Sequence, residues 1–187
     1  MGLFNRLFKK VEEVNKKEAP VEELGEEMFV GTTKEEANNY WVNMAQNIII
    51  NTMRATDGEA ERAFIAIDMR EKPSFEIFYQ FDGKLSKWQE VTDKELKTKL
   101  STQLIPQAPE VAKAVNEQFE DADHPKIAFA ELQFETATSA WFSHIIWEDS
   151  EYTSVPKEEI VEKWFNILKD EVKNTPLDSD RKLSWYL

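Results

Sequence analysis

Residues 63–81 read AFIAIDMREKPSFEIFYQF, and this stretch decides the fold. Apolar side chains stand at every second position on both sides of a short polar turn: Ala63, Ile65, Ile67 and Met69, then Phe75, Ile77, Tyr79 and Phe81. A period of two is typical of β-strands that bury one face. Asp82-Gly83 follows directly, and this dipeptide is a strong signal for a two-residue hairpin turn. The sequence therefore predicts a hairpin over residues 63–81 and allows a third strand at 84–88.

A second pair of strands is predicted over residues 128–147. Its first half repeats the alternation, with Ala128, Ala130, Leu132 and Phe134 on one face. Its second half, AWFSHIIW at residues 140–147, is almost continuously apolar. Continuous apolarity is typical of a strand that is covered on both faces.

Helices are predicted before, between and after these strand pairs. The first begins at Thr33, because Thr33 and Glu36 have the spacing of a capping box. The second runs over residues 96–119 and must break or kink at Pro106 and Pro109, since proline lacks the N–H that a helix interior requires. A third follows the last strand. These elements predict an α+β fold: an antiparallel sheet of four to five strands with helices packed mainly on one face.

Residues 1–27 form a predicted arm, separate from a single α+β domain at residues 28–187. The arm begins as an amphipathic helix whose apolar stripe holds Leu3, Phe4, Leu7, Phe8, Val11 and Val14. Residues 18–27 carry five glutamates with Pro20 and Gly25, which is typical of a linker. Two interpretations of the helix remain open: it docks on its own domain or on a second subunit, forming a homo-oligomer, or it lies on a membrane surface. The apolar residues 183–187 at the other end are expected to dock on the domain.

Composition narrows the classes of function. The formal net charge of −13 disfavours direct nucleic-acid binding and favours basic partners. No run of residues reaches the roughly 18 apolar positions of a membrane span, so we expect no stable membrane insertion and a cytoplasmic location. The chain has no cysteine and two histidines, and it lacks the usual nucleophile and phosphate-loop motifs. We therefore expect no enzyme activity, no cofactor and no metal site.

The order of helix, strand pair, helix, strand pair and helix supports a family resemblance. Residues 61–149 resemble the YezG-type immunity (antitoxin) family of bacterial polymorphic toxin systems. The likeness rests on the two aromatic hairpins, the acidic helical segment between them, and the acidic and aromatic patch Trp147-Glu148-Asp149 with Tyr152. It implies a bacterial cytoplasmic protein that binds and neutralises a cognate secreted toxin, often a nuclease.

An acidic surface is the predicted binding site for that partner. Carboxylates on a rigid surface can compete with phosphates for the arginine and lysine donors of a nuclease groove. The predicted residues are Glu117, Glu120, Asp121, Asp123, Glu148, Asp149 and Glu151, with Trp147 and Tyr152 as aromatic anchors. For any one carboxylate, ordinary solubilising charge remains an equal alternative. The alternative function is a non-catalytic adaptor or secretion chaperone that binds through the apolar stripe of residues 3–14.

Overall fold

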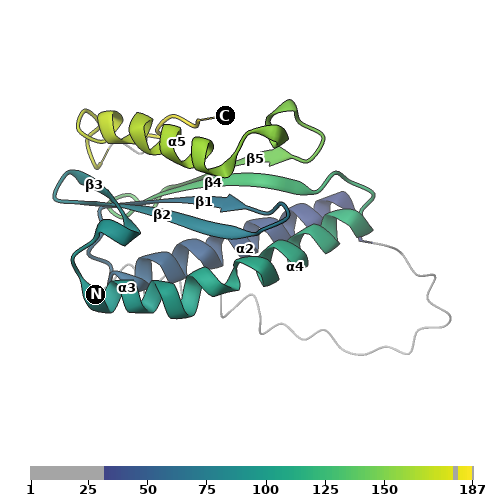
Figure 1. Ribbon diagram of the computed structural model, residues 1–187, viewed down its shortest axis with the longest axis horizontal. Helices are drawn as coiled ribbons and strands as arrows, with labels where there is room; N and C mark the ends of the chain where they lie inside the picture. The colour runs from purple at the N-terminus through teal and green to yellow at the C-terminus, as the bar shows by residue number, and fades with distance from the viewer. Residues whose placement is uncertain (1–31, 179–180, 187) are drawn as a thin grey trace. The chain divides into compact units, whose positions relative to one another are not determined.

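The computed structural model describes residues 32–178 and 181–186, which belong to one compact unit, Gly31–Leu187. The arm predicted at residues 1–27 lies outside the described residues. Five strands form one antiparallel sheet in the order β3-β2-β1-β4-β5. Their bounds are β1 Arg62–Asp68, β2 Ser74–Phe81, β3 Lys84–Lys87, β4 Ile127–Glu135 and β5 Trp141–Trp147. The α+β architecture and the antiparallel sheet predicted from the sequence are confirmed (Figure 1).

β1 occupies the centre of the sheet. It pairs with β2 from Arg62 opposite Gln80 to Asp68 opposite Ser74, and with β4 from Arg62 opposite Glu135 to Asp68 opposite Phe129. All seven of its residues are buried. Burial of both alternating sets means that each face of the sheet must be covered by another layer.

The first layer covers the face that the sequence pattern predicted. It contains α2 Lys34–Ala55, α3 Lys94–Lys99, a π-helical turn Leu100–Leu104, a 3-10 turn Ile105–Gln107 and α4 Ala108–Asp121. The core on this side holds the predicted strand residues Ala63, Ile65, Ile67, Met69, Phe75, Ile77 and Tyr79. The predicted break near Pro106 and Pro109 is confirmed, because the π and 3-10 turns separate α3 from α4.

The start of α2 shows the predicted capping box. The backbone N–H of Thr33 donates to Glu36 Oε2 at 2.8 Å, and the N–H of Glu36 donates to Thr33 Oγ1 at 3.2 Å. These bonds satisfy two donors that a helix N-terminus otherwise leaves free. The bond from the Thr33 backbone also lowers the pKa of Glu36, because it stabilises the charged carboxylate.

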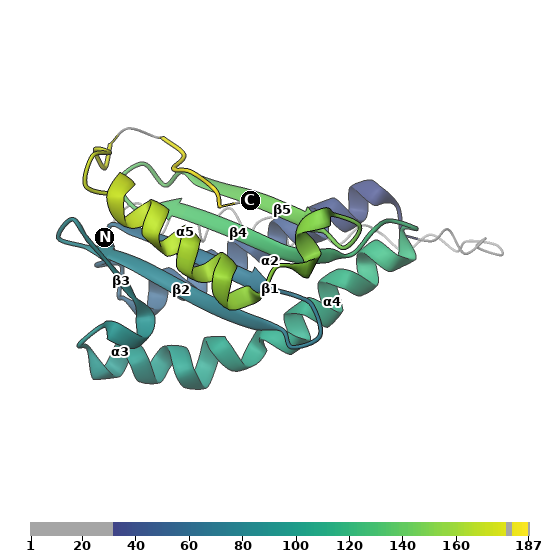
Figure 2. The ribbon, with the colours of Figure 1, turned by 45° about the horizontal axis from the view of Figure 1, so that its top comes forward.

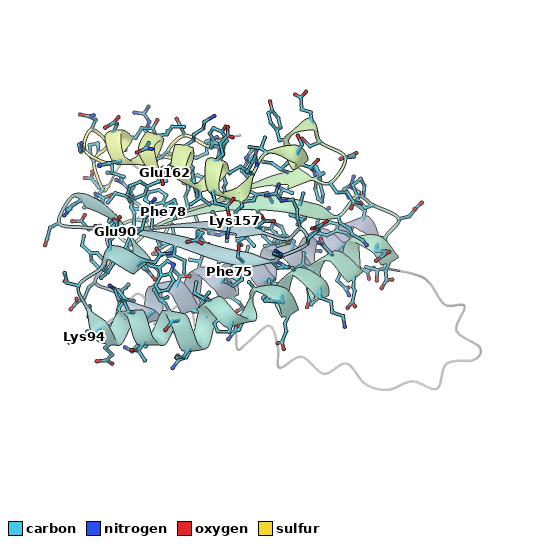
Figure 3. All side chains as sticks on the ribbon, viewed as in Figure 1. Phe75, Phe78, Glu90, Lys94, Lys157 and Glu162 are labelled. Atoms are coloured by element: carbon cyan, nitrogen blue, oxygen red, sulfur yellow. The ribbon has the colours of Figure 1, made fainter. Side chains whose placement is uncertain are left out.

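The second layer consists of α5 Lys157–Glu171 and the C-terminal residues 183–186. Trp164 of α5 packs edge-on against Phe64 and Phe78, with ring centroids 6.2 and 5.7 Å apart. Figure 3 shows Phe78 on the α5 side of β2 and Phe75 on the other side. The predicted docking of the C-terminal residues is confirmed, because Leu183 is buried in this second core.

The prediction for residues 140–147 is met only in part. β5 lies at the edge of the sheet, and among its seven residues only Ile146 is buried. Trp41 of α2 contacts one face through a bond from Nε1 to Ser143 Oγ at 3.3 Å, and Trp185 stacks on His144 on the other face. An edge strand exposes one side of its backbone, so its side chains are half-buried despite their apolar character.

A buried arginine joins the sheet to the second layer. Arg62 Nε and Nη2 donate to Glu135 Oε2 at 2.9 and 2.5 Å, and Nη1 donates to Gln80 Oε1 at 3.1 Å. The same guanidinium reaches the chain beyond α5, donating to the carbonyl oxygens of Thr175 at 3.2 Å and Pro176 at 2.7 Å. Arg62 is 2% exposed and Glu135 is 5% exposed, so water does not screen this ion pair.

Replacing this arginine should be costly. Arg62→Met leaves the buried carboxylate of Glu135 without its charge partner, and we expect a loss of about 3–5 kcal/mol in the free energy of unfolding. Urea denaturation at pH 7 measures the loss. The matched control is Lys126→Met, which removes an exposed ion pair with Glu120 and should change little. The double variant Arg62→Met/Glu135→Leu should recover much of the loss; equal effects of Arg62→Met and Lys126→Met would contradict the role of Arg62.

Candidate functional site

The nine residues predicted for partner binding lie at one end of the sheet, where α4 and β5 both end (right in Figure 1). They come from the last turns of α4 and the turn after it (Glu117, Glu120, Asp121 and Asp123), the end of β5 (Trp147), and the turn and 3-10 helix that follow β5 (Glu148, Asp149, Glu151 and Tyr152). All seven carboxylate residues are exposed, and Tyr152 is 44% exposed. We call this set the acidic end.

Lys126 links the two halves of the acidic end. Its Nζ lies 2.9 Å from Glu120 Oε2 of α4, and this carboxylate raises the pKa of the lysine. Its backbone N–H donates to Glu148 Oε1 at 3.2 Å, and its carbonyl accepts from the N–H of Glu148 at 2.9 Å. The turn after α4 is therefore fixed to the end of β5 by backbone bonds as well as by charge.

Trp147 is the centre of a small aromatic cluster. Its ring lies 5.1 Å from Phe119 of α4 and 4.6 Å from His124, measured between centroids and with edge-on geometry. The half-buried indole therefore packs against the end of α4 and the turn that follows it. Only its exposed part could contact a partner. The sequence did not indicate this packing, because Phe119 and Trp147 are far apart along the chain.

The 3-10 helix Glu151–Ser154 is held by Arg70, which follows β1. Arg70 Nη1 donates to the carbonyl oxygens of Thr153 at 2.8 Å and Val155 at 2.7 Å, while Asp68 accepts from the same guanidinium. The side-chain bond to Asp68 is the main cause that raises the pKa of Arg70. Glu151 and Tyr152 are thus presented from a turn that is tied to the central strand.

Several carboxylates at the acidic end have no compensating partner. Within residues 32–178 and 181–186, Asp121, Asp123, Asp149 and Glu151 take part in no ion pair. Glu117 differs, because Lys113 Nζ lies 3.7 Å away on the same helix. An exposed carboxylate without an intramolecular cation remains available to an external one.

The described residues contain no group of three or more histidine, aspartate or glutamate side chains that could hold a metal ion. A cavity of about 320 Å³ lies between α2 and the π-helical turn, lined by Asn51, Arg54, Ala55, Lys99, Leu100, Gln103, Leu104 and Gln107. Lys99 in this lining is already paired with Asp57 and Glu95. No motif in the sequence indicates this cavity, since the amide side chains that line it come from two separate helical segments.

A buried carboxylate lies on the opposite face, beneath the C-terminal residues. Glu131 of β4 is fully buried, and its Oε1 accepts from the N–H of Tyr186 at 3.3 Å. Its Oε2 lies 3.5 Å from His144 Nδ1, and neither atom has a hydrogen-bond partner among the described residues. Burial raises the pKa of Glu131 above its ordinary value of 4.5, and the contacts with His144 and Tyr186 oppose this only in part.

The sequence matches no protein-family model and no curated protein. Within the part of the chain that the structure describes, no helix is both long enough and apolar enough to span a bilayer.

Glu131 should make stability depend on pH in a defined direction. Because its folded pKa is raised, the folded state holds a proton that the unfolded state releases above about pH 4.5. The stabilisation that Glu131 contributes to the folded state is complete below pH 4.5, and it is lost as pH rises through the folded pKa. Glu131→Gln keeps an acceptor for Tyr186 but cannot ionise, so its stability relative to the wild type should increase with pH from 4.5 upward. Thermal melting at several pH values measures the difference.

The control for that measurement is Glu151→Gln, which alters an exposed carboxylate without a partner among the described residues. Its stability relative to the wild type should stay constant over the same pH range. If the difference for Glu131→Gln is equally constant, the buried carboxylate does not retain its proton.

Proposed function

We propose that this protein is a bacterial cytoplasmic immunity protein that binds a cognate toxin, a nuclease, and blocks its basic substrate groove with the acidic end. The observation that carries the proposal is the gathering of seven exposed carboxylates at one end of the sheet, four of them with neither an ion pair nor a side-chain hydrogen bond in the described chain. The protein is an inhibitor in this proposal, not an enzyme, and it needs no cofactor.

Charge supports the choice of partner. A nuclease groove holds phosphates with arginine and lysine side chains, and carboxylates form charge-assisted hydrogen bonds with the same donors. The net charge of −13 would also steer a basic domain toward this protein over distances of about 8 Å at physiological ionic strength.

Rigidity supports the same conclusion. The carboxylates follow α4 and β5, and the turns that carry them are tied by Lys126 to Glu148 and by Arg70 to Thr153 and Val155. A surface that is ordered before binding loses less conformational entropy when the complex forms. Tyr152 offers an aromatic ring beside these charges, and tyrosine is enriched among residues that dominate binding energy.

Charge reversal tests the proposal, and the structure selects the positions. Asp121, Asp149 and Glu151 make no ion pair within the described residues, whereas Glu148 accepts from Lys126 and Asp123 has a positive φ of 50°. The triple variant Asp121→Lys/Asp149→Lys/Glu151→Lys should therefore keep its fold. We expect association with the toxin to slow by about tenfold or more, because electrostatic steering can change rates by 10–10³-fold. Surface plasmon resonance at low and high salt measures the rate.

The matched control carries the same change in net charge at positions outside the acidic end: Glu59→Lys/Glu110→Lys/Asp178→Lys. Its association rate and its protection of cells should fall much less. The toxin domain for both measurements is to be cloned from the gene adjacent to the one for this chain. Protection is measured as the growth of cells that express this domain together with the wild type or a variant. If both triple variants lose association rate and protection equally, the effect comes from net charge and not from the acidic end. If binding does not depend on salt, the interface lies at residues 3–14 instead, and the adaptor function is favoured. A neighbouring gene without a secreted toxin would count against immunity itself.

A further inference from the structure

The two edges of the sheet differ in how they are protected. β3 has four residues, and two of them are Lys84 and Lys87, of which Lys87 pairs with Glu162 of α5. Short length and lysine are common means by which proteins prevent an edge strand from pairing with another chain. β5 has seven residues, WFSHIIW, with no lysine, proline or carboxylate among them. The β5 edge is therefore open to pairing in a way that the β3 edge is not.

The free backbone groups of β5 follow from its pairing with β4. The N–H of Glu135 donates to the carbonyl of Ala140 at 2.9 Å, so Ala140 faces β4. Because antiparallel pairing alternates, the N–H and C=O groups of Trp141, Ser143 and Ile145 point away from β4. No strand in residues 32–178 or 181–186 pairs with that side of β5. Unpaired groups along an apolar strand form a template for another strand.

Helix α2 extends this uncharged surface. The bond from Trp41 Nε1 to Ser143 Oγ places the first turns of α2 beneath β5, whereas the bond from Tyr79 to the carbonyl of Thr52 places its last turns beneath β2. Figure 2 shows α2 crossing behind the sheet. From Ala37 to Met53 the helix carries no charged residue, although 32% of the chain is charged. Val42, next to Trp41, is 38% exposed.

We propose that two copies of this chain join through their β5 strands, paired antiparallel about a two-fold axis at His144, to form one continuous sheet. In this register Trp141 lies opposite the second copy's Trp147, Phe142 opposite Ile146 and Ser143 opposite Ile145. Aromatic and β-branched side chains are favourable partners across strands. The protected β3 edge stops further growth, so the assembly closes as a dimer.

Charge limits where a second copy can bind, and the β5 edge is a surface that satisfies the limit. Two chains of net charge −13 repel each other, so a stable contact between them must exclude the charged surfaces. β5 and the adjoining surface of α2 meet this requirement. In the antiparallel arrangement Glu148 and Asp149 of one copy lie near the turn at residues 136–140 of the other, which is uncharged. Contacts between the two α2 helices add uncharged area that a strand pair alone does not supply, because the exposed residues of this part of α2 are Asn39, Val42, Asn43, Asn47 and Asn51.

The mass of the full chain in solution provides the first test. Sedimentation equilibrium should give twice the chain mass of 21.9 kDa. Ser143→Pro removes an outward N–H without removing a donor to β4, and proline is tolerated in edge strands at such positions. It also removes the hydroxyl that accepts from Trp41, so circular dichroism must show that the variant is folded. Two hydrogen bonds are lost per dimer, so the dissociation constant should rise by about tenfold or more. A monomer for the wild type at all concentrations, or a folded Ser143→Pro variant that dimerises unchanged, overturns the proposal.

A cysteine pair tests the register independently of that variant. The chain has no cysteine, so a single substitution introduces the only thiol. In His144→Cys the two Cβ atoms should lie about 4.5–5.5 Å apart across the axis, close enough for a disulfide after a small adjustment. In Phe142→Cys, on the same face of the same strand, they should lie roughly 13 Å apart. Oxidation should crosslink the first variant and not the second on a non-reducing gel. Crosslinking of both, or of Phe142→Cys alone, overturns the β5 pairing.

Discussion

The second layer of this protein depends on the burial of Arg62. One face of the sheet is almost wholly apolar, and α2 and α4 cover it mainly by hydrophobic contact, with few hydrogen bonds such as that from Tyr79 to the carbonyl of Thr52. The other face contains the buried polar residues Arg62, Gln133 and Glu135 beside Phe64 and Phe78. Polar groups can be buried at low cost only when their hydrogen bonds are satisfied. Here part of that requirement is met by backbone atoms of residues 175, 176 and 183, which fixes where the chain must run after α5.

The sequence predicts one layer well and the other poorly, for a physical reason. Alternation in residues 63–81 marks the first face because Ala63, Ile65 and Ile67 repeat at a period of two. The opposite face is also buried, with Phe64 and Phe78 in contact with Trp164, but its cover comes from a helix far along the chain. Local pattern cannot reveal such a partner. The edge position of β5 escaped prediction likewise, since strand order is a tertiary property and apolarity alone does not encode it.

In the candidate site, too, the sequence predicts the exposed residues but not the contacts between distant segments that hold them. Carboxylates at the ends of predicted elements are exposed as expected, because turns lie at the surface. The contacts that organise them come from Lys126 and Arg70, and neither was predicted, since each acts on a segment distant in sequence. Charge and apolar character are separated in this fold: carboxylates gather where α4 and β5 end, and uncharged residues follow the β5 edge and α2. A toxin would therefore contact the carboxylates at the end of the sheet and a second copy would contact the β5 edge, and the two surfaces meet at Trp147, the last residue of β5.

The central place of β1 also has a consequence for the order in which the fold forms. Arg62 bonds to Gln80, 18 residues away, but its other sheet partner, Glu135, is 73 residues away. The hairpin of β1 and β2 can close quickly, whereas β4 must find the free side of β1 after a long stretch of chain has been synthesised. Closing a long loop costs entropy before any contact repays it, and folding rates fall as the sequence separation of contacts grows. We expect the pairing of β4 with β1 to be the slow event in folding, and a chain that has not yet made it would leave the free edge of β1 open to other chains.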